Sequence, residues 1–485
     1  MEYSEISAMT QLYLSSQVKQ IDAKAMQKFE LSSYQLMQKA GAALFAFVKK
    51  HKKILVITGA GNNAGDGFII ANLALQNNIK VTVLSLVEIE KLPEDAHLAA
   101  QEFLKSGGVI SDEIIEQRYD CIVDAIFGTG LSRNVEGVFA QTIEWINQQA
   151  TTIISVDIPS GLETDTGQIM NTAVYADITI AVICLKPGYF TNSGKDCVGD
   201  LHLETLGMEE DDFEDFPSAI QLLNKSVLKQ NLFQHKHNSH KGSFGNVVIA
   251  GGHQGMLGAV ILAGKSALIS GCGLVEVVTN NPQSVLISLH CPELLTASSV
   301  NESRIIYQAD VIAAGPGLGI VKSSYEVLQK CLELNKPMVI DADALTLISM
   351  HQLKLNKNCV MTPHPKEAAR LLNTSVSNIQ SDRIKAAQQL SEKFNTVAIL
   401  KGSGTIVADT NGDVFINPYG YSGMASAGMG DVLTGMVASL IAQGFSGINA
   451  AITAVVWHAK AAETANKGNC LIATDVINTL SQEIT

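Results

Sequence analysis

The stretch of sequence that decides the fold of the C-terminal half is Ser422-Gly423-Met424-Ala425-Ser426-Ala427-Gly428-Met429-Gly430-Asp431-Val432-Leu433-Thr434-Gly435. Small residues run up to the core Gly428–Asp431, and an apolar helical pattern follows at once. Glycine lets backbone N–H groups approach an anion closely, and a helix N-terminus adds unpaired N–H groups and the positive end of the helix dipole. The stretch therefore predicts a phosphate-binding loop that leads into a helix.

Asp431 is the unusual member of this loop. A carboxylate beside a bound anion repels the anion, unless the carboxylate has a chemical task such as accepting the proton of an attacking hydroxyl. The alternative is an aspartate that only caps the N-terminus of an ordinary helix. The density of glycine and other small residues before Asp431 favours the anion site.

Length and composition are typical of a large α/β protein. The chain has 485 residues, which exceeds one ordinary core, so we expect at least two domains. Its 39 glycines and its 46% hydrophobic residues suit buried strands that end in glycine-rich loops. The net charge of −13 argues against nucleic acid or an anionic membrane as a partner.

The N-terminal residues, the most apolar stretch and the cysteines indicate the cellular compartment of the protein. Residues Met1–Thr10 lack the basic and apolar regions of a signal peptide. The most apolar stretch, Met256–Val275, contains Lys265 and several glycines, so we interpret it as a buried helix and not as a membrane span. The eight cysteines form no CxxC pair, which favours reduced thiols. We expect a cytoplasmic protein that forms a homo-oligomer.

The first half alternates between short β-branched runs and helix-length segments, which predicts a parallel sheet with helical crossovers. One opening helix is expected over about Ser15–Lys50. The predicted strands are Lys53–Thr58, Lys80–Leu86, Tyr119–Asp124, Thr152–Asp157 and Asp177–Cys184. Sheets of this kind carry their chemistry just beyond the carboxyl ends of the strands.

An acidic run that ends in a proline, Glu209–Pro217, marks the expected domain boundary. The expected parts are a first domain at 1–215, a linker at 216–240 and a second domain at 241–485. The linker contains His235, His237 and His240, but no matching set of carboxylates or cysteines. We therefore interpret this segment as a solvated loop and not as a metal site.

The second half repeats the alternation of strands and helices. The predicted strands are Gly245–Ala250, Leu274–Thr279, Val311–Ala314, Met338–Asp341, Cys359–Thr362, Thr396–Lys401 and Thr405–Ala408. Helical patterns at Val432–Gln443 and Ile448–Asn466 close the domain. This alternation again predicts an α/β domain.

A glycine-rich segment follows the first predicted strand. Gly59, Gly61 and Ala64 satisfy the loose dinucleotide fingerprint GxGxxA, and Glu88 stands near the position expected for a ribose contact. A lone match of this kind is weak support for a dehydrogenase. The polar residues Asn62 and Asp66 in the same segment are not needed by a plain fingerprint.

Polar residues also follow the third and fourth predicted strands. The side-chain oxygens of Asn63, Asp124 and Ser160 should therefore meet at one edge of the sheet. A set made only of oxygens suits a hard cation and not zinc or copper. Asp157, beside a proline turn, is a candidate acid or base, although an aspartate there can also be an ordinary turn residue.

Three motifs of the first half resemble the epimerase domain of the NAD(P)H-hydrate repair enzymes: GNNAGDG at 61–67, DAIFGTGL at 124–131 and VDIPSG at 156–161. The resemblance implies a Rossmann-like three-layer domain that binds hydrated NAD(P)H, and a potassium ion on Asn63, Asp124 and Ser160. The residues implied to hold the hydrated cofactor are Asn62, Asn63, Ala64, Gly65, Asp66, Gly128, Thr129, Gly130, Leu131, Ser132, Arg133, Asn134 and Asp157. Ala64 stands where the family pattern has glycine.

Several motifs of the second half could carry chemistry, and each has a plain alternative. Asp341 and Asp343 follow a predicted strand and could be a turn residue and a helix cap. His364 lies between two prolines that restrict its backbone, which favours binding over a simple backbone contact. Lys401 precedes Gly402 and resembles a nucleotide contact, but the P-loop spacing GxxxxGK[ST] is absent.

The order of the motifs HKGSFG at 240–245, AGPGLG at 314–319, DADAL at 341–345, TPHPKEAARLL at 362–372, KGSGT at 401–405 and GMASAGMGDVLTG at 423–435 resembles the dehydratase domain of the same family. The resemblance implies a ribokinase-like α/β/α fold and ADP-dependent dehydration. The implied contacts of the hydrated nicotinamide nucleotide are Ala259, Gly317, His364 and Asp431. The implied contacts of ADP are Lys401, Gly402, Ser403, Gly404, Thr405 and Gly430, with the loop from Ser422. Tyr421 and Ala427 stand where the family pattern has asparagine and glycine.

We expect a bifunctional enzyme that repairs NADHX and NADPHX, the hydrated forms of NADH and NADPH. The first half would exchange the R and S epimers, with Asp157 as the catalytic residue. The second would phosphorylate the hydroxyl of the S form from ADP, with Asp431 as the base and Mg²⁺ on the phosphates. Two alternatives stay open: a ribokinase-like small-molecule kinase, and a first half that only binds a ligand.

Overall fold

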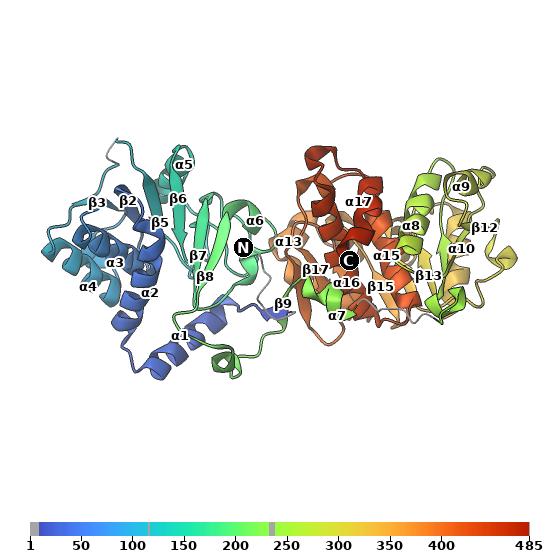
Figure 1. The fold of residues 1–485 in the computed structure, drawn as a ribbon, viewed down its shortest axis with the longest axis horizontal. Helices are drawn as coiled ribbons and strands as arrows, with labels where there is room; N and C mark the ends of the chain where they lie inside the picture. The colour runs from blue at the N-terminus through green and yellow to red at the C-terminus, as the bar shows by residue number, and fades with distance from the viewer. Residues whose placement is uncertain (1–8, 115–116, 232–237, 485) are drawn as a thin grey trace. The chain divides into compact units, whose positions relative to one another are not determined.

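The computed structural model describes residues 9–114, 117–231 and 238–484 (Figure 1). The chain forms two compact units: the first is Gln11–Ser218, and the second is Ala219–Thr485 together with residues just before Gln11. Each unit is built on its own sheet with helical crossovers. The α/β fold class expected from the sequence is confirmed.

The first unit contains a parallel sheet with the strand order β4-β3-β2-β5-β6-β7-β8. Its strands are β2 (Lys53–Thr58), β3 (Lys80–Ser85), β4 (Ile110–Ser111), β5 (Cys121–Ala125), β6 (Thr152–Val156), β7 (Ile178–Val182) and β8 (Asp200–Glu204). Its helices are α1 (Ser15–Phe29), α2 (Ser33–Val48), α3 (Asn62–Gln76), α4 (Glu94–Lys105), α5 (Gly137–Asn147) and α6 (Gly194–Cys197).

The two faces of this sheet pack against different helices, as alternation along a strand requires. Val56 of β2 belongs to the core that includes residues of α2, α3 and α4. Its neighbours Leu55 and Ile57 belong to the core formed with α5. Figure 1 shows α2, α3 and α4 beside the sheet. The unit is therefore the three-layer domain that the sequence predicts.

The opening segment differs from the expected single helix. Helices α1 and α2 are separate, because Glu30 adopts the left-handed conformation with φ 54° and ends α1. The side chain of Ser32 then caps α2 by accepting a hydrogen bond from the Gln35 N–H at 3.2 Å. An apolar pattern that continues across such a break does not reveal it.

The second unit contains a mixed sheet with the strand order β1-β9-β18-β17-β16-β15-β14-β13-β10-β11-β12. The β16–β17 and β17–β18 pairs are antiparallel, and the pairs from β12 to β16 are parallel. Its strands are β1 (Met9–Gln11), β9 (Ile220–Leu223), β10 (Asn246–Ala250), β11 (Leu274–Val278), β12 (Leu295–Ala297), β13 (Val311–Ala314), β14 (Met338–Ile340), β15 (Cys359–Met361), β16 (Val397–Leu400), β17 (Thr405–Ala408) and β18 (Val414–Asn417).

Helices cover both faces of the second sheet. Val247 of β10 packs in the core that includes residues of α8, α15 and α16. Its neighbour Val248 points to the opposite face of the sheet and is also fully buried, although it does not belong to that core. Leu328 of α10 and Leu390 of α14 are also fully buried. The helices are α7 (Ser226–Asn231), α8 (Leu257–Ile269), α9 (Val285–His290), α10 (Lys322–Glu333), α11 (Ala342–His351), α12 (Pro365–Leu372), α13 (Val376–Ser381), α14 (Arg383–Phe394), α15 (Met429–Ala442), α16 (Gly447–Ala465) and α17 (Ala473–Thr479).

Part of the segment expected as a linker belongs to the second unit. Strand β9 pairs in parallel with β18, and Leu223 and Val227 are buried in the core. His235 and His237 lie outside the described residues. The apolar stretch Met256–Val275 also differs from expectation, because it contains α8 and the start of β11 instead of one helix.

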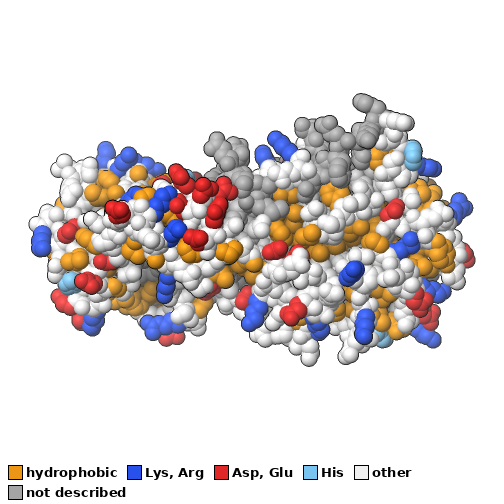
Figure 2. All heavy atoms as spheres, turned by 90° about the horizontal axis from the view of Figure 1, so that it is seen from below, with side chains coloured by type: hydrophobic (Ala, Val, Ile, Leu, Met, Phe, Trp, Pro, Cys, Tyr) orange, Lys and Arg blue, Asp and Glu red, His pale blue; other side chains and the backbone are white. Residues whose placement is uncertain are grey.

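The surface and the cysteines fit the sequence-based expectations. Figure 2 shows acidic and basic side chains interspersed over the face that it draws. Among the helices of the described ranges, none combines the length and the apolar character needed to cross a membrane. All eight cysteines are unbonded thiols, and only Cys470 is exposed.

Candidate active sites

Asn63, Asp124 and Ser160 lie together at the carboxyl edge of the first sheet. The hydroxyl of Ser160 donates to Asp124 Oδ1 at 2.5 Å, and the Ser160 N–H donates to Oδ2 at 2.9 Å. The Phe127 N–H donates to Ser160 Oγ at 2.8 Å, and its carbonyl accepts from Asn63 Nδ2 at 3.1 Å. The three residues that sequence analysis selected as cation ligands are thus joined through one short loop.

The environment of Asp124 fits a hard cation. The carboxyl group is fully buried, and burial raises its pKa, although hydrogen bonds from Ser160 and Ser155 oppose the shift. Within the described part of the chain, no lysine or arginine pairs with it. The carboxylate accepts hydrogen bonds from the hydroxyls of Ser155 and Ser160 and from the N–H groups of Ser160 and Ile126. The carboxylate itself, the Ser160 hydroxyl and the Phe127 carbonyl are the kinds of oxygen that a hard cation such as potassium prefers.

Asp157 is held in an uncommon backbone conformation directly after β6. Its φ is 64°, a value that favours glycine, and such strained residues gather at functional sites. Its Oδ1 accepts hydrogen bonds from Lys186 Nζ at 2.5 Å and from the Val182 N–H at 3.1 Å. Its carbonyl accepts a hydrogen bond from the Tyr189 hydroxyl at 2.7 Å. Two neighbours therefore fix this carboxylate, and a third fixes the backbone of Asp157.

Lys186 and Asp22 belong to this site, and sequence analysis missed both. Burial is the largest influence on Lys186 and disfavours its charge, but Asp157 together with Tyr189 and Cys184 raises the pKa of the lysine above its ordinary value. Burial raises the pKa of Asp22 to about 6. Lys186 opposes this shift, and Asp157 adds to it. Burial and then Asp157 also raise the pKa of Asp66. Asp22 and Asp157 therefore share the charge of one buried lysine, and Asp66 lies in the field of both carboxyl groups.

A recognisable signal existed for only one of the two missed residues. Lys186 precedes Pro187 and Gly188 just beyond β7, so it follows the same rule of strand ends that selected Asp124 and Asp157. Asp22 lies on α1, far from any strand end. Only the packing of the chain brings Asp22 to the site.

The other predicted cofactor contacts of the first unit lie on two segments at the same edge. Helix α3 begins at Asn62, and Ala64 is fully buried in the apolar core, so its methyl group packs away from solvent. Gly65 is buried against Met37 of α2. The second segment follows β5 and comprises Gly128, Thr129, Gly130, Leu131, Ser132, Arg133 and Asn134. A side chain at Gly128 would contact Asn63 at 3.4 Å, so the two segments touch.

The predicted phosphate loop of the second unit leads into a helix, as expected. Gly428 has a φ of 88°, and α15 begins at the next residue. Asp431 therefore lies in the first turn of α15. Burial raises its pKa to about 7; Asp341 adds to the shift, and Lys401 opposes it.

Lys401 and Asp341 form a buried ion pair beside this helix. Lys401 Nζ lies 2.8 Å from Asp341 Oδ1, and the Thr434 hydroxyl donates to Oδ2 at 2.9 Å. Burial would raise the pKa of Asp341, but Lys401 outweighs burial and lowers it. Conversely, burial would lower the pKa of Lys401, and Asp341 outweighs burial and raises it. A side chain at Gly430 would lie 3.2 Å from Lys401 Nζ, so the loop contacts the ion pair.

His364 caps α12 and faces Glu367. Its Nδ1 accepts hydrogen bonds from the Lys366 and Glu367 N–H groups at 3.1 and 3.2 Å. This pattern assigns the proton of the neutral ring to Nε2, which lies 3.5 Å from Glu367 Oε1. Burial raises the pKa of Glu367, Lys401 opposes the shift, and Asp341 adds to it. Glu367 is thus a further member of the site that sequence analysis missed.

Gly317 and Ala259 lie next to each other, as a shared contact with one ligand requires. Gly317 has a φ of 52°, and a side chain there would lie 3.3 Å from Ala259 Cβ and 2.7 Å from Met256 Cβ. The Asp343 carboxylate accepts a hydrogen bond from the Gly319 N–H at 2.8 Å, which ties this loop to the end of β14.

Three buried polar atoms beside the nucleotide loop have no hydrogen-bond partner among the described residues: His458 Nε2, the Tyr421 hydroxyl and Ser426 Oγ. Burial lowers the pKa of His458 to about 4, and Lys401 adds to the shift, so the ring is neutral at pH 7. Unsatisfied buried polar groups are costly and often mark a ligand site. Ala427, which departs from the family pattern, is exposed.

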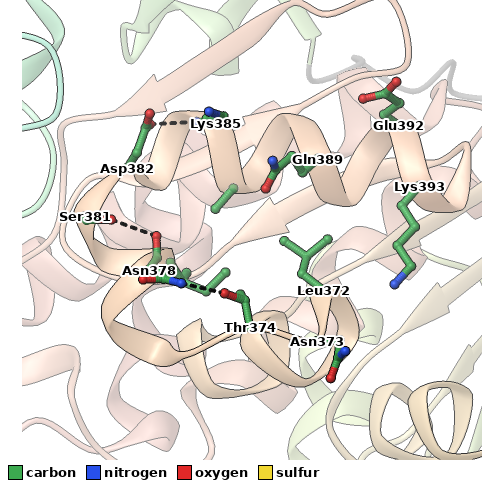
Figure 3. A pocket seen from close by; sticks show the side chains of 12 residues that line it. Leu372, Asn373, Thr374, Asn378, Ser381, Asp382, Lys385, Gln389, Glu392 and Lys393 are labelled. Carbon is green, nitrogen blue, oxygen red and sulfur yellow. Dashed lines mark hydrogen bonds between the residues drawn. The ribbon is translucent and has the colours of Figure 1, made fainter.

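A groove of about 900 Å³ lies away from these residues, between α12, α13 and α14 (Figure 3). The Asn378 amide donates to the Thr374 hydroxyl at 2.9 Å, and the Ser381 hydroxyl donates to the Asn378 carbonyl at 3.0 Å. Its polar groups are thus bonded to one another. None of the predicted site residues lines this groove, so we place the chemistry at the strand ends.

Comparison with known proteins agrees with the motifs. Residues 33–188 match the family model described as YjeF-related protein N-terminus, and residues 247–485 match the model described as NAD(P)H-hydrate dehydratase. The second unit resembles the crystal structure of a ribokinase-like superfamily protein from Enterococcus faecalis, with a TM-score of 0.52 and 28% identity over 56% of this chain and 96% of that chain. This similarity confirms the predicted ribokinase-like fold.

Two curated relatives match almost the whole chain. The bifunctional NAD(P)H-hydrate repair enzyme Nnr of Escherichia coli is 38% identical over 99% of this chain and 95% of its own length. The enzyme of the same name from Coxiella burnetii is 35% identical over 96% of this chain and 98% of its own length. The chain therefore belongs to the family of bifunctional NAD(P)H-hydrate repair enzymes.

Proposed function

We propose that the first unit exchanges the R and S epimers of NADHX and NADPHX, and that the second unit dehydrates the S epimer with ADP. The names of the full-length relatives and both matching family models support this pair of activities. The observation that carries the proposal is that the candidate acid–base residue of each unit lies at a lysine–aspartate ion pair: Asp157 is itself paired with Lys186, and Asp431 lies in the field of the pair formed by Lys401 with Asp341.

In the first unit, Asp157 exchanges a proton with the substrate hydroxyl. Inversion at the carbon that bears the hydroxyl requires its C–O bond to break and to re-form on the opposite face, so the carboxyl gives a proton to the leaving hydroxyl and takes one back from the returning water. Lys186 holds the carboxylate through Oδ1, and Tyr189 holds its carbonyl, so the acid–base group is preorganised. The exposed loop that contains Gly130 and Arg133 covers the nucleotide part of the substrate.

Potassium is bound by Asn63, Asp124 and Ser160 with neighbouring carbonyl oxygens. The fully buried carboxylate of Asp124 and the oxygens of Ser160 and Phe127 beside it support this assignment. When bound, the ion supplies positive charge that orders the loops after β5 and β6 around the substrate. Ser160 and Asn63 also fix the Phe127 backbone, which begins the substrate loop.

In the second unit, Asp431 accepts the proton of the substrate hydroxyl. A pKa near 7 is well matched to a general base at neutral pH. The N–H groups of Gly428 to Gly430 and the Lys401 ammonium stabilise the transferring phosphoryl group. The carboxylate lies in the first turn of the helix that presents those N–H groups, so base and anion site are adjacent.

The products of this step are AMP and a phosphate ester of the substrate hydroxyl. Phosphate then leaves together with a proton from the neighbouring carbon, which restores the dihydronicotinamide. Magnesium is expected on the phosphates of ADP, because phosphate oxygens are ligands that this ion prefers. We also assign to the protein a cytoplasmic location. We further assign it a homo-oligomeric state, which size-exclusion chromatography tests. Its unbonded cysteines support the location.

One assay tests the proposed function. Purified protein is mixed with both NADHX epimers and either ADP or ATP, and dihydronicotinamide absorbance and AMP are followed. Recovery of NADH from both epimers, with one AMP for each NADH under ADP, is expected. A stable phosphorylated product without NADH would establish the kinase alternative, which the relatives do not favour.

A further inference from the structure

Arg383, the first residue of α14, is buried although it is a long charged side chain. Only 2% of its surface is exposed, and it is among the largest fully buried side chains. The carboxylate of Asp382 accepts a hydrogen bond from the Lys385 N–H at 2.9 Å and thereby fixes the start of the helix. Figure 3 shows Asp382, Lys385 and Gln389 beside the groove, so these residues mark the outer side of α14.

The guanidinium of Arg383 lies against both ends of the nucleotide loop. Its Nη2 lies 3.3 Å from the carbonyl of Leu400, 3.4 Å from that of Lys401 and 3.5 Å from that of Gly404. Its Nη1 donates to Gln380 Oε1 at 2.9 Å. A single planar group thus shares its protons among carbonyls that enter and leave the loop Lys401–Thr405.

Gly402 leaves room for this group. Its φ is 146°, and a Cβ there would lie 2.7 Å from both Nη1 and Nη2 of Arg383. Such a distance is too short for any real Cβ, so the loop backbone rests directly on the guanidinium. The presence of glycine at position 402 of the KGSGT motif is therefore explained in part by the guanidinium of Arg383, which occupies the space of a side chain.

The same contacts reach the buried ion pair. The Lys401 carbonyl faces Arg383, while the Lys401 ammonium pairs with Asp341. The backbone of Lys401 is therefore fixed from one side and its side chain from the other. Lysine at position 383 would present a compact ammonium, whose donors do not match the planar fork of arginine.

We infer that Arg383 is a positioning residue for the adenine nucleotide: it fixes the Lys401–Thr405 loop in the conformation that receives ADP. The inference rests on the proposed function of that loop. Arg383 acts through the loop backbone and touches neither substrate nor phosphate. Its loss should weaken ADP binding and leave binding of the hydrated cofactor unchanged.

The test is steady-state kinetics of dehydration with the full-length chain and the variant Arg383→Lys. We expect the KM for ADP to rise about tenfold or more, with kcat within about threefold and the KM for S-NADHX unchanged. The kcat and the KM for S-NADHX of the same sample report that the second unit is folded, and epimer exchange at the wild-type rate reports the same for the first unit. An unchanged KM for ADP, or equal losses with both substrates, would overturn the inference.

A milder variant keeps the test decisive if Arg383→Lys fails to fold. Gln380→Met removes the side-chain oxygen that orients Nη1 and lies outside the loop. We expect it to raise the KM for ADP about threefold, and no rise would then refute the inference. The matched control is Lys385→Met on the groove side of α14, which should change neither KM.

The variant Lys401→Met separates this inference from the proposed function. If it raises the KM for ADP and Arg383→Lys does not, the loop binds ADP and the inference about Arg383 is wrong. If the wild-type protein shows no ADP-dependent recovery of NADH, the proposed function fails, and the inference fails with it.

Discussion

Both units contain a buried lysine paired with an aspartate, but the candidate acid–base residue stands in a different place in each. In the first unit, Lys186 pairs at 2.5 Å with Asp157, the candidate itself. In the second, Lys401 pairs at 2.8 Å with Asp341, and the candidate Asp431 is a neighbour of the pair.

This difference matches the chemistry proposed for each unit. A lysine paired directly with the acid–base group fixes its position, which suits reversible proton exchange. A carboxylate beside a completed ion pair feels the negative charge of Asp341 as well as burial, and the pKa of Asp431 rises to about 7. Such a group accepts a proton near neutral pH, while Lys401 faces the phosphates.

The largest expected effect comes from Asp431→Asn. The amide cannot accept the hydroxyl proton, so ADP-driven recovery of NADH should fall by on the order of 10³-fold. Epimer exchange should continue at the wild-type rate, because the two sites use different carboxylates. Dihydronicotinamide absorbance and chromatography of the epimers measure the two rates in one sample. Recovery at the wild-type rate would remove Asp431 from the mechanism.

The next largest effect is expected from the variant Lys186→Met. It leaves Asp157 without its partner, so epimer exchange should fall by about 10²-fold, and the free energy of unfolding by about 3 kcal/mol. Exchange rates and chemical denaturation check both effects. Lys24→Met, which removes an exposed ion pair with Asp215, is the control and should leave exchange unchanged. Unaltered exchange in Lys186→Met would show that the ion pair is dispensable.

Potassium should have a smaller effect, confined to the first unit. Replacing KCl by NaCl, or Ser160 by Ala, should slow epimer exchange by roughly tenfold, because the loop after β5 loses an oxygen ligand or its ion. Rates measured across a KCl titration give the affinity. Equal exchange rates in the two salts would contradict the assignment of Asn63, Asp124 and Ser160 to potassium.

The smallest expected effect is a shift in pH dependence. Since Asp431 must be deprotonated to act, dehydration should slow as the pH falls through about 7. The charge of Asp341 helps to raise this pKa, so Asp341→Asn should move the acidic limb of kcat/KM to lower pH by about one unit. The test is a pH–rate profile of the residual activity. A limb that does not move would show that burial alone sets the pKa of Asp431.

Local sequence patterns predicted much of this architecture. Strands such as β2 and β13 match their predicted ranges because buried parallel strands are short apolar runs, and the loop at Gly428 leads into α15 as its glycines indicated. Short strands such as β9 went undetected because a run of four residues carries too little pattern to be distinguished from a loop.

The parts of the sites that sequence analysis missed depend on contacts between distant segments. Asp22 lies on a helix and reaches Asp157 only through packing. Arg383 carries no motif, and Glu367 lies inside TPHPKEAARLL without a role that the motif assigns to it. Their place beside Lys401 appears only when α12 and α14 are set against the sheet. Strand-end rules find residues on loops after strands, but they do not find the helix residues that hold those loops.

The most direct test of two separate sites is a single time course with Asp157→Asn, given equal amounts of R- and S-NADHX with excess ADP. Chromatography follows each epimer while absorbance follows NADH. We predict that the S form is consumed at the wild-type rate and the R form remains, so that recovery stops near one half. Consumption of both epimers at wild-type rates would contradict the account.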